Sequence, residues 1–218
     1  MSLTLVIGNK NYSSWSLRPW LLLKQFGVAF DEIKLPLDTP EFYARLQQYS
    51  PAGRVPVLVD GALSVWDSLA ICEYVNEQYL EGRGLPADRV SRARARAISA
   101  EMHAGFCALR DALPVNCCKR APTPALDADV QRDIARIRAI WCEARTQHAQ
   151  QGAFLFGEFS IADAMYAPVA VRFTSYAIEL GELERRYVEA LLALPALQEW
   201  FAEAATEPLA PLHERNTA

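Results

Sequence analysis

Long apolar runs and concentrated positive charge are both missing from this 218-residue sequence. No run of about 18 apolar residues is present, as a membrane-spanning helix would require, and the apolar run at the N-terminus is too short for a signal peptide. The net charge is −4, and no basic tract could neutralise a row of phosphates. We therefore expect a cytoplasmic protein that binds neither membranes nor nucleic acid.

Paired cysteines and hydrolase motifs are missing too. The five cysteines are odd in number and form no C-x-x-C pair, so neither a disulfide framework nor a zinc site is expected. Cys117 and Cys118 are adjacent, and adjacent residues are poorly placed to bind one metal ion. The G-x-S-x-G motif of many serine hydrolases is absent as well. We expect free thiols, no metal, and no hydrolysis through a serine nucleophile.

The sequence does contain enough apolar material for a large core, since 51% of its residues are hydrophobic and 22% are charged. The hydrophobic pattern changes period repeatedly in the first part of the chain and is helical after it, which indicates two domains. Two glycines and a proline between Gly82 and Pro86 mark a linker. We expect one domain at 1–82 and an all-helical one at 88–218.

The first domain is expected to have the element order βαβαββα. Gly27 is suited to end a helix, and Asp60-Gly61 is a strong hairpin signal between two short apolar runs. The expected elements are a strand at 3–7, a helix at 15–26, a strand at 28–35, a helix at 40–49, a hairpin of strands at 55–59 and 62–65, and a helix from Ser68 onward.

The second domain is expected to consist of helices. Apolar residues at helical spacing predict helices at 90–109, 130–148, 160–178, 183–194 and 196–205. The first of these would carry His103, Phe106, Cys107 and Arg110, which could face a cleft. Core packing or surface exposure explains most such residues, so we assign none of them to catalysis.

The stretch YSSWSLRPW, residues 12–20, has Ser13 and Ser14 where a strand gives way to a helix. The start of a helix exposes unpaired N–H groups and a partial positive charge, so this position suits an anion. The simpler interpretation of the motif alone is structural, because a serine oxygen can accept one of those N–H groups as an N-cap. No neighbouring His or acidic residue could act as a base for either hydroxyl.

Two later motifs also combine a turn with a possible ligand contact. SPAGRVPVLVD has Val55-Pro56 at the start of a strand, where a proline can be cis and can leave neighbouring backbone groups free for a ligand. WDSLAICEYV has Asp67 and Ser68 at another helix start, where unpaired N–H groups suit a carboxylate.

Taken in order, these motifs and a fourth, FSIADA, resemble the glutathione transferase family across nearly the whole chain. Ser160 and Asp163 of FSIADA have the spacing of a capping box, and we expect them to stabilise the helical domain. The resemblance implies an α+β fold in which a thioredoxin-like βαβαββα domain binds glutathione. An all-α C-terminal domain would form most of the acceptor-substrate pocket, and the protein would be a homodimer.

YSSWSLR is most similar to the serine-type classes of that family, and in particular to the zeta-like pattern S-S-x-S-x-R. The resemblance assigns the catalytic position to Ser13, with Ser14 as a close alternative and Tyr12 as a third candidate. A cysteine-type mechanism is not expected, because no Cys precedes Cys72. Arg18 is expected to be structural and to pair with a carboxylate of its own domain.

The same resemblance implies how glutathione would be bound. Val55 would pair main chain to main chain with the cysteinyl unit, and the proline after it would hold the turn in cis. Asp67 and Ser68 would receive the γ-glutamyl end, and Arg54, assisted by Gln48, would lie near the glycyl carboxylate. The residues assigned to glutathione are thus Gln48, Arg54, Val55, Pro56, Asp67 and Ser68.

The function implied by this resemblance is a glutathione transferase. It would bind glutathione as a co-substrate, stabilise its thiolate and add it to a small electrophile. One alternative is a glutathione-dependent cis-trans isomerase of the maleylacetoacetate type, which would need cationic groups such as Arg110 or Arg172 in the acceptor site. Another is a non-catalytic binding or regulatory module, because a fold can persist without its activity.

Overall fold

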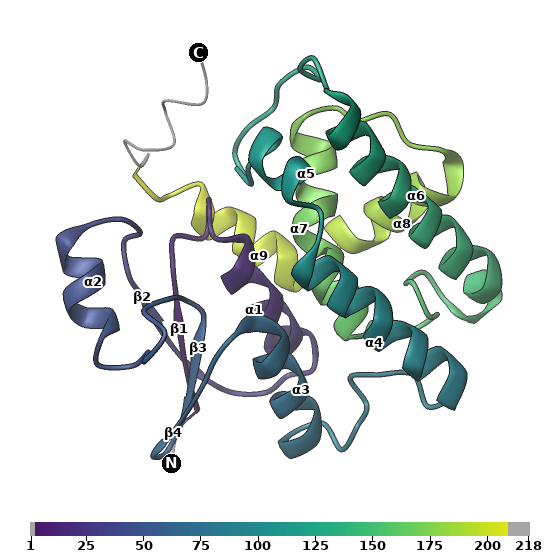
Figure 1. The fold of residues 1–218 in the computed structure, drawn as a ribbon. Helices are drawn as coiled ribbons and strands as arrows, with labels where there is room; N and C mark the ends of the chain where they lie inside the picture. Colours follow the sequence, from purple (N-terminus) through teal and green to yellow (C-terminus); the bar gives the residue numbers. More distant parts are fainter. Residues whose placement is uncertain (1–2, 209–218) are drawn as a thin grey trace.

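The computed structural model describes residues 3–208 and contains a four-stranded mixed sheet (Figure 1). Its strands are β1 (Leu3–Ile7), β2 (Asp31–Lys34), β3 (Val57–Asp60) and β4 (Leu63–Val65), in the spatial order β2-β1-β3-β4. β1 pairs in parallel with β2 and antiparallel with β3, and β3 pairs antiparallel with β4. The predicted strands are confirmed, although β2 is shorter than the expected 28–35.

Three helices cover the two faces of this sheet. α1 (Ser14–Gln25) and α3 (Ser68–Gln78) pack on one face, and α2 (Pro40–Leu46) packs on the other (Figure 1). Because successive side chains of a strand point to opposite faces, Leu5 and Ile7 join the main core, whereas Val6 joins a small core under α2. The order βαβαββα and the thioredoxin-like fold are confirmed.

Helices then follow one another to the end of the described chain. They are α4 (Arg89–Ala104), α5 (Cys107–Ala112), α6 (Ala128–His148), the 3-10 helix η1 (Ala149–Gln151), α7 (Ile161–Ser175), α8 (Glu182–Leu192) and α9 (Pro195–Ala204). Nearly all residues of α7 are buried, and this helix packs against α1, α4 and α8. The expected α+β architecture is confirmed, and the domain limits at 82 and 88 stay a prediction. Within residues 3–208, no helix is long and apolar enough to cross a membrane.

The prediction of a single helix at 90–109 is wrong, because Gly105 and Phe106 separate α4 from α5. Phe106 has a φ of 60°, which lies in the left-handed region and outside a regular α-helix. A Cβ added at Gly105 would come within 2.9 Å of a backbone carbonyl oxygen of α4, so the chain needs glycine there. α5, which carries Cys107 and Arg110, therefore does not continue the helix of His103.

The alanine-rich face of α4 is exposed to solvent. Val90 is 68% exposed, and Ala93 and Ala97 are exposed as well. The residues that α4 contributes to the buried interior are Ala95, Ile98, Ser99 and Met102. The helical period of this segment was therefore predictable, but the face that it turns to the core was not.

α7 begins with the expected capping box. The backbone N–H and the hydroxyl of Ser160 both donate to Oδ2 of Asp163, at 2.8 and 2.9 Å, and the N–H of Leu155 donates to Oδ1 at 3.0 Å. Complete burial raises the pKa of the Asp163 carboxyl to about 6, although these three hydrogen bonds favour its charged form. The predicted capping role of this pair is confirmed.

Candidate functional site

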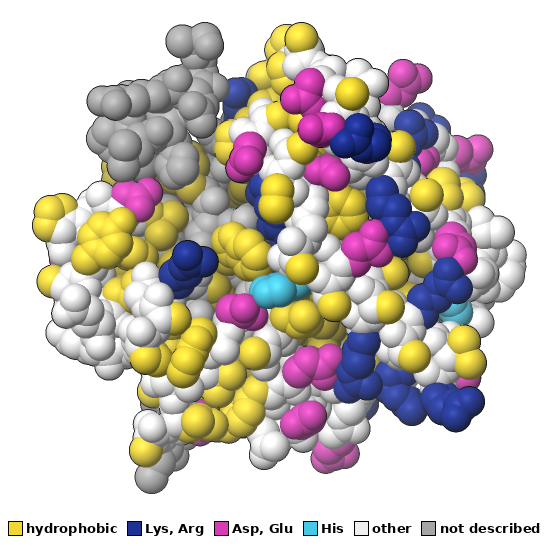
Figure 2. All heavy atoms as spheres, in the orientation of Figure 1, with side chains coloured by type: hydrophobic (Ala, Val, Ile, Leu, Met, Phe, Trp, Pro, Cys, Tyr) yellow, Lys and Arg dark blue, Asp and Glu magenta, His cyan; other side chains and the backbone are white. Residues whose placement is uncertain are grey.

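A cavity of about 490 Å³ lies where the first turn of α1, the loop before β3 and the start of α3 meet the end of α4. Its lining residues are Trp15, Ala52, Arg54, Val55, Pro56, Trp66, Asp67 and His103. Figure 2 shows an acidic and a histidine side chain close together near the middle of one face, with apolar side chains around them. Two further cavities, of about 440 and 530 Å³, contain none of the predicted site residues.

The structure brings four of the predicted glutathione residues together. Arg54, Val55, Pro56 and Asp67 all line the cavity, and the Val55-Pro56 peptide bond is cis, as expected. Ser50 fixes the loop before them, because its hydroxyl donates to the carbonyl of Arg54 at 3.1 Å and accepts the N–H of Arg54 at 3.3 Å. Val55 lies before the start of β3, and its backbone makes no hydrogen bond to the backbone of the other described residues. Its N–H and C=O are therefore available to a ligand.

The other predicted glutathione residues do not line the cavity. Ser68 is fully buried behind it, one residue after Asp67, which caps α3 by accepting the N–H of Leu69 at 3.2 Å. Gln48 is exposed and lies in the turn that follows α2.

The three hydroxyl residues of the β1–α1 turn are buried next to the cavity. Tyr12 is 9% exposed, Ser13 7% and Ser14 6%, and Trp15, which follows them, lines the cavity itself. Ser13 is the N-cap of α1, since its Oγ accepts the N–H of Ser16 at 3.3 Å, and the structural interpretation of this serine is confirmed.

The hydroxyl groups of Ser13 and Ser14 differ in their partners. The Ser13 hydroxyl donates to Oγ of Ser16 at 2.7 Å, and the same Oγ accepts the N–H of Gly8 at 3.1 Å. The Ser14 hydroxyl has no hydrogen-bond partner among the described residues. Ser13 is therefore engaged inside the turn, whereas Ser14 has an uncommitted donor.

Trp15 connects the two halves of the cavity. The guanidinium groups of Arg18 and Arg110 lie 4.3 and 4.8 Å from its ring centroid, within the range of a cation–π interaction. The ring of His103 meets Trp15 edge-on at 5.3 Å, and its Nε2 lies 3.1 Å from Oδ2 of Asp67. The end of α4 is thus in contact with the starts of both α1 and α3.

Sequence reasoning missed Trp15 and did not assign His103. The sequence could have predicted that Trp15 lies at the site, because this residue directly follows the two serines of a helix start that suits an anion. His103 had none, because the face that α4 turns to the cavity depends on how the helical domain packs against α1 and α3.

Three arginines form a cationic cluster behind Trp15. Burial, with the charge of Arg110 as a second cause, lowers the pKa of Arg18 to about 9, and burial lowers that of Arg172 to about 9. Arg172 donates to the carbonyls of Arg110 and Leu113, and Arg110 donates to those of Gly105 and Met102. Neither Arg110 nor Arg172 lines the cavity.

Arg18 is completely buried, and the carboxylate partner expected for it is not found among residues 3–208. Its Nη1 donates to Oγ of Ser68 at 3.3 Å, while its Nε and Nη2 are buried without a hydrogen-bond partner in the described chain. The expected ion pair is therefore wrong. A buried positive charge without a full set of partners lies instead between the start of α1 and the start of α3.

The fold and the cavity define a two-domain protein in which a thioredoxin-like sheet domain and an all-helical domain meet beside a cis-proline loop. The chain matches the family model of the glutathione S-transferase N-terminal domain over residues 12–78. It matches that of the glutathione S-transferase C-terminal domain over residues 124–203. Together the two models cover about two thirds of the chain, which belongs to the glutathione S-transferase family.

Among curated proteins, the chain is similar to a dichloromethane dehalogenase of Methylorubrum extorquens, with 38% identity over 74 residues. It is also similar to a probable maleylacetoacetate isomerase of Caenorhabditis elegans, with 36% identity over 93 residues. These matches cover 33% and 43% of this chain, but only 25% and 42% of the two relatives.

Solved structures share the whole fold at low sequence identity. A glutathione transferase homolog from Burkholderia, solved with bound glutathione, has a TM-score of 0.72 and 24% identity, and the match covers 95% of this chain and 100% of that one. Poplar glutathione transferase F1 has a TM-score of 0.68 and 19% identity, with the same coverage of both chains.

The incomplete pairing of Arg18 predicts an unusual response to substitution. We expect Arg18→Met to raise the free energy of unfolding at pH 7 by about 1–3 kcal/mol, because Met fills much of the same volume without a buried charge. The folded-state pKa of Arg18 lies below its unfolded value, so the destabilising effect of its charge is fully present at pH 7 and declines above about pH 9. Denaturant unfolding at pH 7 and at pH 10 measures both effects.

Arg172→Met is the matched control, because Arg172 is also buried and has a similarly lowered pKa. Its guanidinium is hydrogen-bonded to two backbone carbonyls, which would lose their donor, so this variant should lose about 1–3 kcal/mol. Equal destabilisation by both substitutions would contradict the incomplete pairing of Arg18.

Proposed function

We propose that this protein is a glutathione transferase, which binds glutathione in the cavity, holds its thiol as a thiolate and adds it to a small electrophile. The observation that carries the proposal is the meeting of three elements around one cavity. These are the start of α1, the loop with the cis Val55-Pro56 bond, and Asp67 at the start of α3. Bound glutathione in the similar Burkholderia protein supports the choice of co-substrate.

Glutathione would lie extended between these elements. Val55 offers an unpaired N–H and C=O to the backbone of the cysteinyl unit. The side chain of Asp67 is 53% exposed, and its carboxylate would accept a hydrogen bond from the α-amino group of the γ-glutamyl end. The α-carboxylate would bind the first N–H groups of α3 at Ser68, next to the charge of Arg18. Arg54, assisted by Gln48, would bind the glycyl carboxylate.

The sulfur would lie against the start of α1. An unperturbed thiol has a pKa of about 8.5, and each unit by which the site lowers it corresponds to about 1.4 kcal/mol. The partial positive charge of the helix start and a hydroxyl donor from the turn would supply this stabilisation. The proton leaves to solvent, the thiolate forms a C–S bond, and the leaving group of the electrophile departs with its electron pair.

The donor hydroxyl is assigned to Ser13, which takes the catalytic position by resemblance to the serine-type classes. Ser14 is the rival, because its hydroxyl is uncommitted while that of Ser13 is donated to Ser16. Tyr12 is the third candidate and is buried in the same turn.

A glutathione-dependent cis-trans isomerase is the second candidate, favoured by the similarity to a probable maleylacetoacetate isomerase. A diacid substrate would need cationic partners in the acceptor part of the cavity. Arg110 and Arg172 are engaged with backbone carbonyls, which weighs against this candidate. A non-catalytic binding module is the third candidate.

A homodimer belongs to the same proposal. Val90, Ala93 and Ala97 of α4 leave an apolar strip exposed, and with Ile140 of α6 they line a groove of about 440 Å³. The charged groups Arg94 and Glu101 flank the strip, as at the rim of an interface between two copies.

Light scattering should give about twice the mass of one 24.3 kDa chain. Ala97→Glu places a charge in the strip and should produce monomers, whereas Leu183→Glu, at an exposed apolar position on α8, should leave the dimer intact. A monomeric wild type would refute the dimer.

The transferase proposal predicts retention on immobilised glutathione and glutathione-dependent turnover of 1-chloro-2,4-dinitrobenzene. Asp67→Asn should raise the KM for glutathione about tenfold, because a charged hydrogen bond to its amino group becomes a neutral one. Asp38→Asn is the control, because the Asp38 carboxylate accepts the hydroxyl of Tyr43 and does not line the cavity. Absence of glutathione binding would favour the non-catalytic module, and faster conversion of a maleyl diacid than of the aryl halide would favour the isomerase.

The proposed role of Ser13 predicts a shift of the bound thiol. Ser13→Ala should raise the pKa of the thiol of bound glutathione by about one unit, which reduces the thiolate population about tenfold at a pH below the wild-type thiol pKa. It should also cost about 1 kcal/mol of stability, because the N-cap of α1 is lost.

Ultraviolet titration of the bound thiolate measures the pKa, and Ser14→Ala and Tyr12→Phe are the comparison variants. A shift in Ser14→Ala or Tyr12→Phe with none in Ser13→Ala would move the donor role to that residue.

A further inference from the structure

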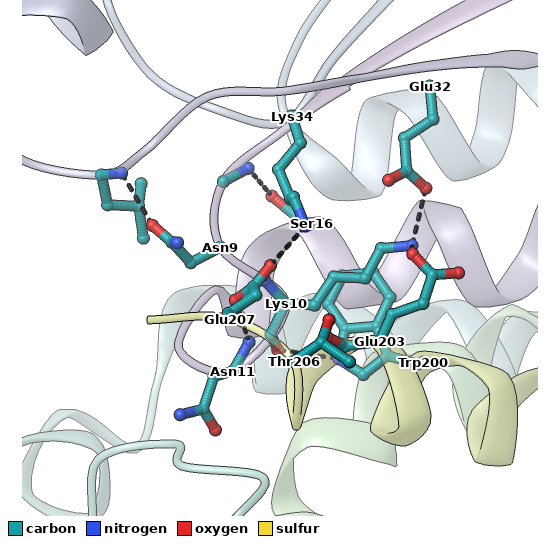
Figure 3. A network of polar contacts seen from close by, with 12 residues as sticks. Asn9, Lys10, Asn11, Ser16, Glu32, Lys34, Trp200, Glu203, Thr206 and Glu207 are labelled. Atoms are coloured by element: carbon teal, nitrogen blue, oxygen red, sulfur yellow. Dashed lines mark hydrogen bonds and ion pairs between the residues drawn. The ribbon is translucent and has the colours of Figure 1, made fainter. Parts of the chain in front are cut away.

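A network of polar contacts ties the C-terminal end of the described chain to the loop at 9–11, which leads from β1 to the serine turn (Figure 3). The loop lies directly before Tyr12 and Ser13. The partners come from the last turn of α9 and from the residues that follow it. Two segments that are nearly 200 residues apart in sequence therefore meet directly before the serine turn.

Glu207 makes the most direct of these contacts. Its Oε1 accepts the backbone N–H of Lys10 at 2.9 Å, and its Oε2 accepts the backbone N–H of Asn11 at 3.1 Å (Figure 3). Its side chain is 3% exposed, and the ammonium group of Lys34 lies 2.9 Å from Oε1. One carboxylate thus satisfies two consecutive N–H groups of the loop.

Lys10 fixes the same loop through its side chain. It is 1% exposed, and its Nζ lies 2.8 Å from Glu32 and 2.7 Å from Glu203. The ammonium group lies 4.6 Å from the ring centroid of Trp20 and 5.2 Å from that of Trp200, and Trp200 donates its indole N–H to the carbonyl of Lys10 at 2.8 Å. α9 is therefore docked on the loop independently of Glu207.

The loop passes this constraint to the serine turn through short backbone contacts. The N–H groups of Tyr12 and Ser13 donate to the carbonyl of Asn9 at 3.2 and 2.8 Å. The side chain of Asn9 is itself fixed, because its Oδ1 accepts the N–H of Leu37 at 2.8 Å. The two amides bound by Glu207 lie between Asn9 and Tyr12, inside this turn.

We propose that Glu207 is a positioning residue that holds the loop at 9–11 so that the start of α1 and its serine hydroxyls face the sulfur of glutathione. This role rests on the proposed function. Donors that stabilise a developing or resting charge act only when they are held within about 0.5 Å of the productive geometry. Without Glu207, two adjacent N–H groups lose their shared acceptor and the turn gains alternative conformations.

The geometry distinguishes positioning from general stabilisation of the fold. α9 is also held by Trp200 and Leu197, which are buried in the core, and by the ion pair of Glu203 with Lys10, none of which involves Glu207. Loss of the Glu207 carboxylate therefore loosens the loop and leaves the docking of α9 intact. If Glu207 had only a structural role, its replacement would lower the stability of the protein and leave the pKa of the bound thiol unaltered.

The test compares Glu207→Gln with two controls in the full-length protein. The Gln side chain has one acceptor oxygen, and its NH₂ group would face the second N–H. Glu199→Gln removes an exposed ion pair of α9 with Lys24, and Lys34→Met removes only the charge partner of Glu207. The measurements are hydrogen exchange at the amides of Lys10 and Asn11, kcat and KM for glutathione with the aryl halide, and the pKa of the bound thiol.

For Glu207→Gln we expect faster exchange at both amides and a thiol pKa about one unit higher. At a pH below the wild-type thiol pKa, kcat should be about tenfold lower. The KM for glutathione should change less than threefold, because the binding residues of the cavity are untouched. Both controls should keep wild-type exchange, kcat and thiol pKa, although Lys34→Met should lower stability because the buried carboxylate of Glu207 loses its charge partner. Glu207→Asp keeps the charge but is one methylene too short to reach both amides, and it should behave like Glu207→Gln.

Each other outcome has a definite meaning. Unchanged exchange in Glu207→Gln would show that Glu207 does not hold the loop. Faster exchange with wild-type kcat and thiol pKa would overturn the positioning role, as would an equal loss in Glu199→Gln. A wild type that does not turn over glutathione would refute the proposed function, and this role of Glu207 with it, while the exchange data would still report on the contact itself.

Discussion

The start of α1 sets the main constraint on this structure, because its unpaired N–H groups must be satisfied while the helix end stays beside a cavity. The protein meets the first requirement from within. Ser13 caps the helix by accepting the N–H of Ser16, and the N–H of Ser14 donates to the carbonyl of Tyr12. Glu207 accepts two N–H groups of the loop that precedes this turn. Trp15, in the first turn of the helix, lines the cavity.

Positive side-chain charge adds to the positive end of the helix dipole at the start of α1. Arg18 and Arg110 both stack on Trp15, and Arg18 retains two nitrogens without a partner among the described residues. A buried guanidinium in this condition costs folding free energy, since desolvation is not offset by a carboxylate. The same incomplete pairing leaves a positive potential between the starts of α1 and α3. An anionic ligand bound there would be stabilised by this unsatisfied charge.

Local signals in the sequence predicted most of the fold and part of the site. The Asp60-Gly61 hairpin, the helix starts at Ser13 and Asp67 and the capping box of α7 each depend on neighbouring residues, and all are found. The break at Phe106 was missed, because apolar spacing continues across it. The contacts of His103 and Glu207 could not be predicted either, because each joins residues that are distant in sequence. Glu207 binds an amide 197 positions away.

The lining of the cavity also bears on the choice between the two candidate reactions. Isomerisation of a diacid would need cationic groups to bind its carboxylates, whereas conjugation of an apolar electrophile would need mainly aromatic or aliphatic walls. Of the lining residues with basic side chains, Arg54 lies in the loop assigned to the glycyl carboxylate, and His103 is in contact with Asp67. Trp15 and Trp66 present aromatic surface to the same space. In the proposed transferase, the basic groups that could hold a second carboxylate would thus be engaged, and the remaining surface would suit an apolar electrophile.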